Sequence, residues 1–263
     1  MTVSYRRQGA VAIITIDRPD RRNAVDRATA ESLRSCWQKF DTDDDALVGI
    51  LYGEGGHFSA GADLKAFNLI DHPGGFLGFT RTTVDKPTIA AIEGFCVAGG
   101  LEMALWCDLR VASETAMFGC FERRFGVPLI DGGTQRLPLI VGRARALDLL
   151  LTGREVDASE AMSIGLVNRL VPAGKALEAS VVLAESIAAH PQSALRSDRA
   201  ALLRGVDLHL GLERELGLQS LGAGGAEGVE WFRSGSGRAG KPVSPPAGGR
   251  PGEAGRGEVP SGL

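Results

Sequence analysis

Short apolar runs alternate with segments of helical spacing along the first half of the chain. The runs 11–16, 46–52, 88–92 and 108–112 are predicted strands, because each is short and largely apolar. Between the first two runs, apolar residues recur at intervals of three and four after Asp26, a residue type that caps helices. This alternation predicts an α/β fold, in which right-handed β-α-β units build a mainly parallel sheet.

The second half of the chain changes to a helical pattern. From about Gly142 onward, apolar residues recur at helical spacing, with one short apolar run between the helical segments. The predicted elements are helices over 144–151, 158–163, 177–190 and 192–203, and a strand over 166–171. The sequence therefore predicts a helical C-terminal region that follows the sheet.

The last thirty residues differ in composition from the rest of the chain. Residues 234–263 contain nine Gly and five Pro and almost no large apolar residue. Such a segment cannot bury enough apolar surface to offset the entropy lost on ordering. We therefore expect a core over 1–190, a helical region over 191–233 and a disordered tail over 234–263.

Composition excludes several classes of protein. Lys and Arg number 29 and Asp and Glu 32 among 263 residues, and a net charge of −3 favours neither a nucleic acid nor a membrane partner. No run of 18 apolar residues is present, and the N-terminal segment lacks the features of a signal peptide. The four cysteines are scattered without metal-ligand spacing, so we expect no disulfide framework, no metal site and a cytoplasmic location.

Two small-residue turns could carry chemistry. The turn over 60–62 (Ala-Gly-Ala) follows a predicted strand, where open α/β sheets bind ligands. The turn over 94–100 leads into a predicted helix over 101–106, whose first amides are unpaired. Amides that converge from both turns would form an oxyanion hole, and Glu102 lies one helical turn after Gly99. Such turns can equally serve close packing, and a glutamate in a first helical turn can simply favour the helix dipole.

Several short stretches around these turns carry a more specific pattern. They are 22–24 (Arg-Asn-Ala), 58–64 (Phe-Ser-Ala-Gly-Ala-Asp-Leu), 86–94, 98–102, 107–108, 118–119, 132–137 (Gly-Gly-Thr-Gln-Arg-Leu) and 165–168. At these residues the chain resembles the crotonase (enoyl-CoA hydratase/isomerase) superfamily, in order and spacing, over roughly residues 3–190. The resemblance implies a crotonase-like spiral of β-β-α units with a helical C-terminal region, assembled as a homotrimer or a dimer of trimers.

The resemblance also implies a function. Members of this family bind acyl-CoA thioesters and stabilise an enolate, without a metal or redox cofactor. Carried over to this chain, the oxyanion-hole donors would be the amides of Ala60 and Gly99, and Glu102 and Glu122 would be the catalytic carboxylates. The residues expected to bind substrate are Arg22, Ala24, Ala60, Ala62, Asp63, Leu64 and Gly99. The chain would then be a hydratase of fatty acid metabolism that converts trans-2-enoyl-CoA to 3-hydroxyacyl-CoA.

Two features keep other interpretations open. Glu122 is followed by arginines at 123–124, so its carboxylate could pair with one of them. Asp131 adds a third acid, and because isomerases of the superfamily can use an aspartate here, migration of the double bond in enoyl-CoA is the main alternative. Asp131 could also cap the following helix by accepting from the amide of Gly133 or Thr134. A crotonase-fold protein that binds RNA or another partner without catalysis is a further alternative.

Overall fold

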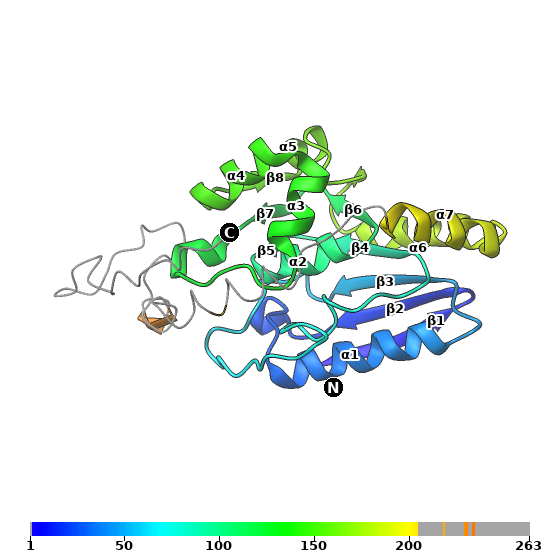
Figure 1. The fold of residues 1–263 in the computed structure, drawn as a ribbon, viewed down its shortest axis with the longest axis horizontal. Helices are drawn as coiled ribbons and strands as arrows, with labels where there is room; N and C mark the ends of the chain where they lie inside the picture. The colour runs from blue at the N-terminus through cyan, green and yellow to red at the C-terminus, as the bar shows by residue number, and fades with distance from the viewer. Residues whose placement is uncertain (1, 205–217, 219–228, 231–232, 235–263) are drawn as a thin grey trace, which may run out of the picture.

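A computed structural model of the chain describes residues 2–204, 218, 229–230 and 233–234 (Figure 1). The predicted tail over 234–263 lies outside the described residues except for Ser234, as does most of the segment from 205 to 233. None of the helices in the described part of the chain is long and apolar enough to cross a membrane.

A six-stranded sheet forms the centre of the described fold, in the order β1-β2-β3-β4-β6-β9. Its strands are β1 (Val3–Gln8), β2 (Val11–Ile16), β3 (Val48–Gly53), β4 (Thr88–Ile92), β6 (Leu109–Ser113) and β9 (Arg169–Val171). β1 is antiparallel to β2, and every other neighbouring pair is parallel. The prediction of a mainly parallel sheet is therefore confirmed.

The helices follow the predicted pattern closely. They are α1 (Arg27–Thr42), α2 (Gly99–Trp106), α3 (Gly133–Val141), α4 (Arg143–Thr152), α5 (Ala158–Ser163), α6 (Ala176–Ala188) and α7 (Gln192–Arg204), with short 3₁₀ helices η1 (Pro19–Arg21) and η2 (Phe121–Phe125). Asp26 caps α1 as predicted, since its side chain accepts a hydrogen bond from the Thr29 amide at 2.9 Å. The four helices predicted after Gly142 correspond to α4 through α7.

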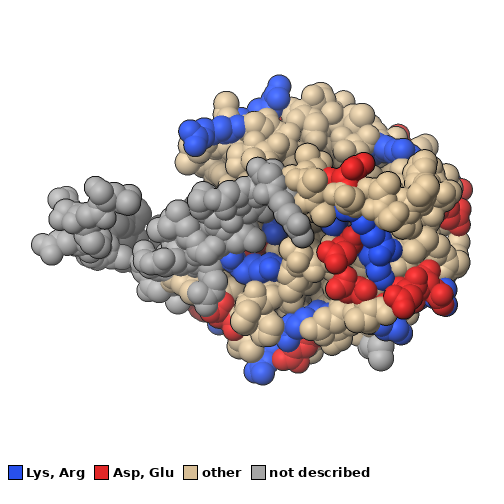
Figure 2. All heavy atoms as spheres, turned by 45° about the vertical axis from the view of Figure 1, so that its right-hand side comes forward, with Lys and Arg blue, Asp and Glu red and all other residues tan. Residues whose placement is uncertain are grey.

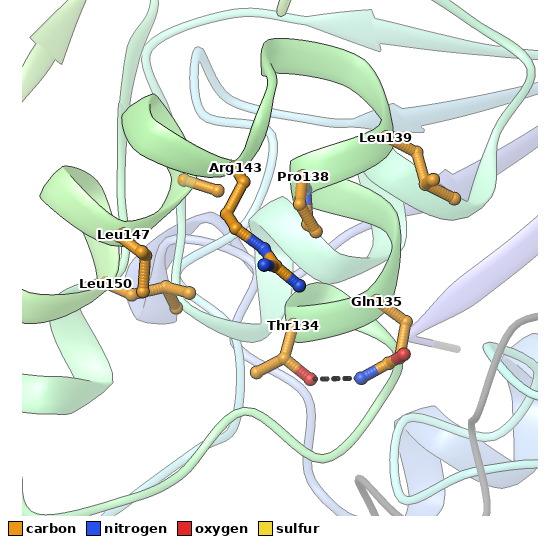
Figure 3. Close-up of a pocket in the computed structure, with 8 residues that line it drawn as sticks. Thr134, Gln135, Pro138, Leu139, Arg143, Leu147 and Leu150 are labelled. Carbon is orange, nitrogen blue, oxygen red and sulfur yellow. Dashed lines mark hydrogen bonds between the residues drawn. The ribbon is translucent and has the colours of Figure 1, made fainter.

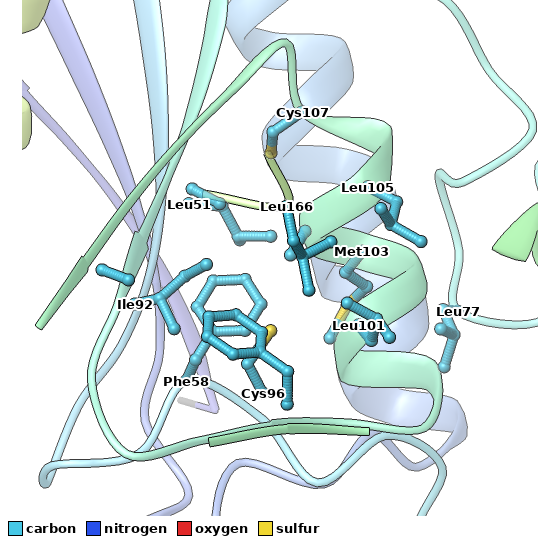
Figure 4. Close-up of a cluster of buried hydrophobic side chains, with 14 of the residues drawn as sticks. Leu51, Phe58, Leu77, Ile92, Cys96, Leu101, Met103, Leu105, Cys107 and Leu166 are labelled. Atoms are coloured by element: carbon cyan, nitrogen blue, oxygen red, sulfur yellow. The ribbon is translucent and has the colours of Figure 1, made fainter. Parts of the chain in front are cut away.

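Alternate residues of the parallel strands face two different cores. Along β2, Ala12, Ile14 and Ile16 belong to the core that α1 and α2 cover, whereas Val11 and Ile13 belong to the core that α6 covers. Burial of both faces explains why these strands are continuous apolar runs and not alternating ones. Figure 4 shows how side chains of α2 enter the first core and hold that helix against the sheet.

The sequence does not predict a second, three-stranded sheet, formed by β5 (Phe95–Val97), β7 (Met117–Gly119) and β8 (Val156–Asp157) in that order. The expectation of a turn over 94–100 is wrong for residues 95–97, which pair in parallel with β7. These strands have two to three residues, and pairing between distant segments leaves no periodicity in so short a run.

Two strands of the main sheet also differ from the prediction. The predicted strand over 166–171 is shorter, because only β9 pairs with β6, while Leu166 and Val167 are buried before the strand begins. β1 has no predicted counterpart, since it is an edge strand with mostly exposed polar residues.

Figure 2 shows acidic and basic side chains lying next to one another on the face it presents.

Candidate active site

The loops that follow β3 and β4 lie side by side and are joined by backbone hydrogen bonds. The Ser59 amide donates to Phe95 O at 2.9 Å, and the Val97 amide donates to Ser59 O at 3.1 Å. Because β3 and β4 are parallel neighbours, their carboxyl ends deliver both loops to one edge of the sheet. Gly61 and Gly99 therefore come together, so that a Cβ atom on Gly61 would lie 2.6 Å from the Gly99 nitrogen.

The structure changes the pair of amides expected to form the oxyanion hole. The Ala60 N–H donates to Arg22 O at 2.9 Å, so the prediction that Ala60 is a donor to substrate is wrong. Ala62 N lies near Gly99, 3.5 Å from where a Cβ atom on Gly99 would be. Neither the Ala62 nor the Gly99 amide has a protein acceptor among the described residues. The amides of Ala62 and Gly99 can therefore both donate to a ligand.

The turn that presents Gly99 is strained. Ala98 has a φ of 52°, in the left-handed region that residues with a side chain rarely adopt. Its carbonyl accepts from the amides of Leu101 and Glu102, and its own amide donates to Gly119 O. These bonds hold Ala98 in a conformation that starts α2 with the Gly99 amide at the positive end of the helix dipole.

A cavity of about 950 Å³ brings the predicted site residues together. Those that line it are Arg22, Ala24, Ala60, Ala62, Asp63, Leu64, Gly99, Glu102, Glu122 and Asp131. Asp63 also holds the loop, since its carboxylate accepts from Arg18 Nη2 at 3.1 Å and from the amides of Lys65 and Ala66. Segments far apart in the chain therefore contribute to one site.

Apolar residues that the sequence reasoning missed form another wall of this cavity. Leu69, Phe76 and Leu77 belong to the long connection between β3 and β4, and Leu77 also contacts the position of Gly99. The available signal is weak: Phe76, Leu77 and Phe79 are apolar residues within a glycine-rich stretch, a pattern that equally fits a packed loop. Phe121, Phe125 and Ile130 also belong to the apolar lining.

Glu102 is buried at the start of α2 and is held by backbone donors. Its Oε1 accepts from the amide of Asp131 at 2.8 Å and from the amide of Gly133 at 2.9 Å. A Cβ atom on Gly133 would lie 3.0 Å from Glu102 Oε1, so a side chain there would crowd the carboxylate. Hydrogen bonds from backbone amides favour the ionised form of a carboxyl group. The environment of Glu102 therefore suits a carboxylate.

Glu122 lies in η2 in the opposite kind of environment. Its side chain is buried, and neither carboxyl oxygen has a hydrogen-bond partner among the residues that the structure describes. Burial raises the pKa of Glu122 to about 8. The buried Cys120 thiol has a pKa raised by burial and further by the charges of Glu122 and Glu102, so both carboxyl groups lie within electrostatic range of one side chain. Burial therefore favours the protonated form of Glu122 at neutral pH.

The two arginines after Glu122 form no ion pair with it in the described part of the chain, although the charge of Arg123 acts to lower the pKa that burial raises. Arg124 donates from Nε and Nη2 to Gly153 O at 3.0 and 2.7 Å, and its guanidinium lies 3.9 Å from the centre of the Phe121 ring. Arg123 is exposed. Neither arginine pairs with Glu122 in the described part of the chain, so the alternative of Glu122 as an ion-pair partner does not hold.

Asp131, the third acid, is also buried and lines the cavity. Its Oδ1 accepts from Thr80 Oγ1 and, at 3.4 Å, from the amide of Leu77. The Gly133 amide, one of the two donors considered for a capping role, donates to Glu102 Oε1. The capping and proton-transfer roles of the Asp131 side chain both stay predictions.

A second hollow, of about 470 Å³, lies between α3 and α4 (Figure 3). It is lined by Thr134, Gln135, Pro138, Leu139, Arg143, Ala146, Leu147 and Leu150. None of these residues is an acid, and none was expected at the site. Because the hollow has no group suited to hold or transfer a proton at neutral pH, acid–base chemistry is assigned to the larger cavity.

Comparisons with known proteins give a consistent result. Residues 6–223 match the family model described as Enoyl-CoA hydratase/isomerase. A probable enoyl-CoA hydratase of Rhizobium meliloti is 40% identical over 215 residues, covering 80% of this chain and 84% of that protein. A short-chain-enoyl-CoA hydratase of Clostridium acetobutylicum is 36% identical over 226 residues, or 81% and 87% of the two chains. The crystal structure of a carnitinyl-CoA hydratase from Mycobacterium avium superposes with a TM-score of 0.82 at 34% identity, covering 89% and 96%.

Proposed function

Since this chain belongs to the enoyl-CoA hydratase/isomerase family and is an enoyl-CoA hydratase, we propose that Glu102 and Glu122 add water to trans-2-enoyl-CoA in the larger cavity. The observation that supports these roles is the contrast between two carboxyl groups in one cavity. Glu102 accepts two amide hydrogen bonds, whereas Glu122 is buried without a partner among the described residues. Environments that separate two pKa values suit a base and an acid.

The proposed reaction begins at the thioester carbonyl. Its oxygen accepts hydrogen bonds from the amides of Ala62 and Gly99, which draw electron density away from C3. Glu102 takes a proton from water as the water oxygen bonds to C3. The electron pair of the double bond moves toward the carbonyl, and Glu122 gives its proton to C2. The proton on Glu102 then returns to Glu122, so the product is 3-hydroxyacyl-CoA and the enzyme is regenerated.

Double-bond migration with Asp131 is the second candidate activity, because this buried acid lines the same cavity. A panel of 2-enoyl-CoA and 3-enoyl-CoA thioesters, assayed for both reactions, separates the two. We expect hydration of crotonyl-CoA to dominate, and we expect full activity after dialysis against EDTA, since the mechanism uses no metal or redox cofactor. Isomerisation faster than hydration would overturn the assignment, and loss of activity that Mg²⁺ or Zn²⁺ restores would overturn the cofactor proposal.

We also propose a cytoplasmic homotrimer or dimer of trimers that acts in fatty acid metabolism. Support comes from the family to which the chain belongs and from the cysteine usage of the sequence. Sedimentation velocity on the full chain distinguishes the two assemblies from a monomer, and cell fractionation tests the location.

The rate of hydration is expected to fall at alkaline pH. The pKa of Glu122 is raised to about 8 by burial, so the carboxyl group is protonated below this pH and loses its proton above it. A general acid must carry its proton, so kcat should fall about tenfold for each unit of pH above about 8. A kcat profile measured from about pH 6 to about pH 10 checks this. A profile that stays level to the alkaline end would show that Glu122 is not the acid.

A further inference from the structure

Asp131 connects two parts of the cavity through different atoms. Its amide donates to Glu102 Oε1 at 2.8 Å. Its side-chain Oδ1 accepts from the hydroxyl of Thr80 and, at 3.4 Å, from the amide of Leu77. Leu77 lines the cavity and contacts the position of Gly99. One buried residue thus joins the carboxylate expected to act as base to the apolar wall of the pocket.

Glycines leave room for each charged group of this cluster. A Cβ atom on Gly75 would lie 2.5 Å from Asp131 Oδ1 and would collide with the Thr80 hydroxyl. Gly132 has a φ of +102°, and a Cβ atom there would collide with the guanidinium of Arg136. Gly75 therefore leaves room for the bond between Thr80 and the Asp131 carboxylate, and Gly132 leaves room for the guanidinium that bonds the Asp131 carbonyl.

Arg136 joins the segment that contains Asp131 to the segment that contains Thr80. Its Nη1 donates to Asp131 O at 2.9 Å, and its Nη2 donates to Thr80 O at 2.7 Å. Arg81 adds a parallel bond by donating from Nη2 to Ile130 O. The peptide groups on both sides of the Asp131 Cα are thus held against residues 80–81, which limits how far the Asp131 amide can move from Glu102.

We propose that Asp131 is a positioning residue for hydration: its side-chain bond to Thr80 holds its own amide against Glu102 Oε1. This inference rests on the proposed role of Glu102 as the base. It gives Asp131 a function besides capping and proton transfer, because the carboxylate acts through its backbone and need not touch the substrate. It also makes Thr80, which sequence reasoning did not select, a contributor to the reaction.

The physical consequence lies in the charge and the orientation of Glu102. An amide that hydrogen-bonds a carboxylate lowers its pKa and fixes its direction. If the Asp131 amide moves away, the pKa of Glu102 rises and the carboxylate is less well aligned with water. A displacement of about 1 Å in a reacting group can cost about 100-fold in rate. Binding of the acyl-CoA should change little, because neither Thr80 nor the Asp131 carboxylate is assigned to hold it.

The test removes the hydroxyl of Thr80 and keeps its shape. We expect Thr80→Val to lower kcat for crotonyl-CoA between about 10- and 100-fold, with KM changed less than about twofold. At acid pH kcat falls as the base, Glu102, takes up a proton, and in Thr80→Val this fall should begin at a higher pH. Thr80→Ser, which keeps the hydroxyl, should restore both the kcat and the pH profile of the wild type. In a Glu102→Gln background, Thr80→Val should cause no further loss, because its effect passes through the carboxylate. A purely structural role would not move the pH profile.

The matched control is Thr82→Val, which removes a hydroxyl from the same loop. Thr82 Oγ1 donates to Phe79 O at 2.6 Å, away from Asp131, so kcat and the pH profile should match the wild type. If Thr80→Val does not fold, Thr80→Ala, which also removes the hydroxyl, is carried through the same measurements with the same expectations. An unshifted pH profile, or a loss of equal size in the Glu102→Gln background, would overturn the proposal. A Glu102→Gln enzyme with wild-type kcat would instead overturn the proposed function.

Discussion

Substituting either Glu102 or Glu122 by glutamine should lower kcat for hydration of crotonyl-CoA by between about 10² and 10⁴-fold. Glutamine keeps the shape of glutamate but cannot accept or release the proton, so the KM should stay close to that of the wild type. Steady-state kinetics at neutral pH measure both constants. The double variant should be little slower than either single one, because the two groups act in one step.

The matched control is Glu155→Gln, which makes the same chemical change at an exposed side chain that lines the same cavity. Its kcat should equal that of the wild type, since the side chain of Glu155 is exposed to solvent. Near-normal hydration by Glu122→Gln would contradict the two-carboxylate mechanism. In that case Glu122 would be a buried acid without a role in proton transfer, although it lines the same cavity as Glu102.

Adding one methyl group at Gly61 should close the oxyanion hole. A Cβ atom there would lie 2.6 Å from the Gly99 nitrogen, so it would block the donor or push it away. Loss of one oxyanion-hole donor costs about 10² to 10³-fold in kcat, and we expect Gly61→Ala to fall in this range. The rate of crotonyl-CoA hydration, measured alongside the melting temperature, tests this expectation.

Gly56→Ala is a close control for this substitution. Gly56 and Gly61 both have a φ of +83°, so alanine at either position meets the same backbone strain of about 1–2 kcal/mol. A Cβ atom on Gly56 would meet no other atom within 4 Å. Gly56→Ala should therefore lose only the stability that this strain costs and keep its activity. Equal activity of the two variants would show that the amides near Gly61 do not bind the carbonyl.

Elements with a strong local pattern could be predicted from the sequence. α1 has a capping aspartate and buried apolar residues at helical spacing, and both features act within a few residues. The parallel strands are apolar on both faces, so their identity does not depend on which neighbour they meet. By contrast, β5 and β1 have their strand conformation because of the partners they pair with, and neither has a pattern of its own.

For the candidate site, too, the sequence predicts some features and the tertiary structure decides the others. Residue types and their order along the chain were enough to predict that Glu102, Glu122 and the two turns would share one site, because the motifs that resemble the family can be identified in the sequence alone. Which amide faces the substrate depends on the direction in which each backbone N–H points. Ala60 and Ala62 flank the same glycine, and nothing in the sequence shows which of the two amides points into the site. The tertiary structure decides between them, since Arg22 O occupies the Ala60 amide and leaves that of Ala62 facing Gly99. The acid and base roles likewise depend on burial and on distant donors such as the Asp131 amide, and these exist only once the chain has folded.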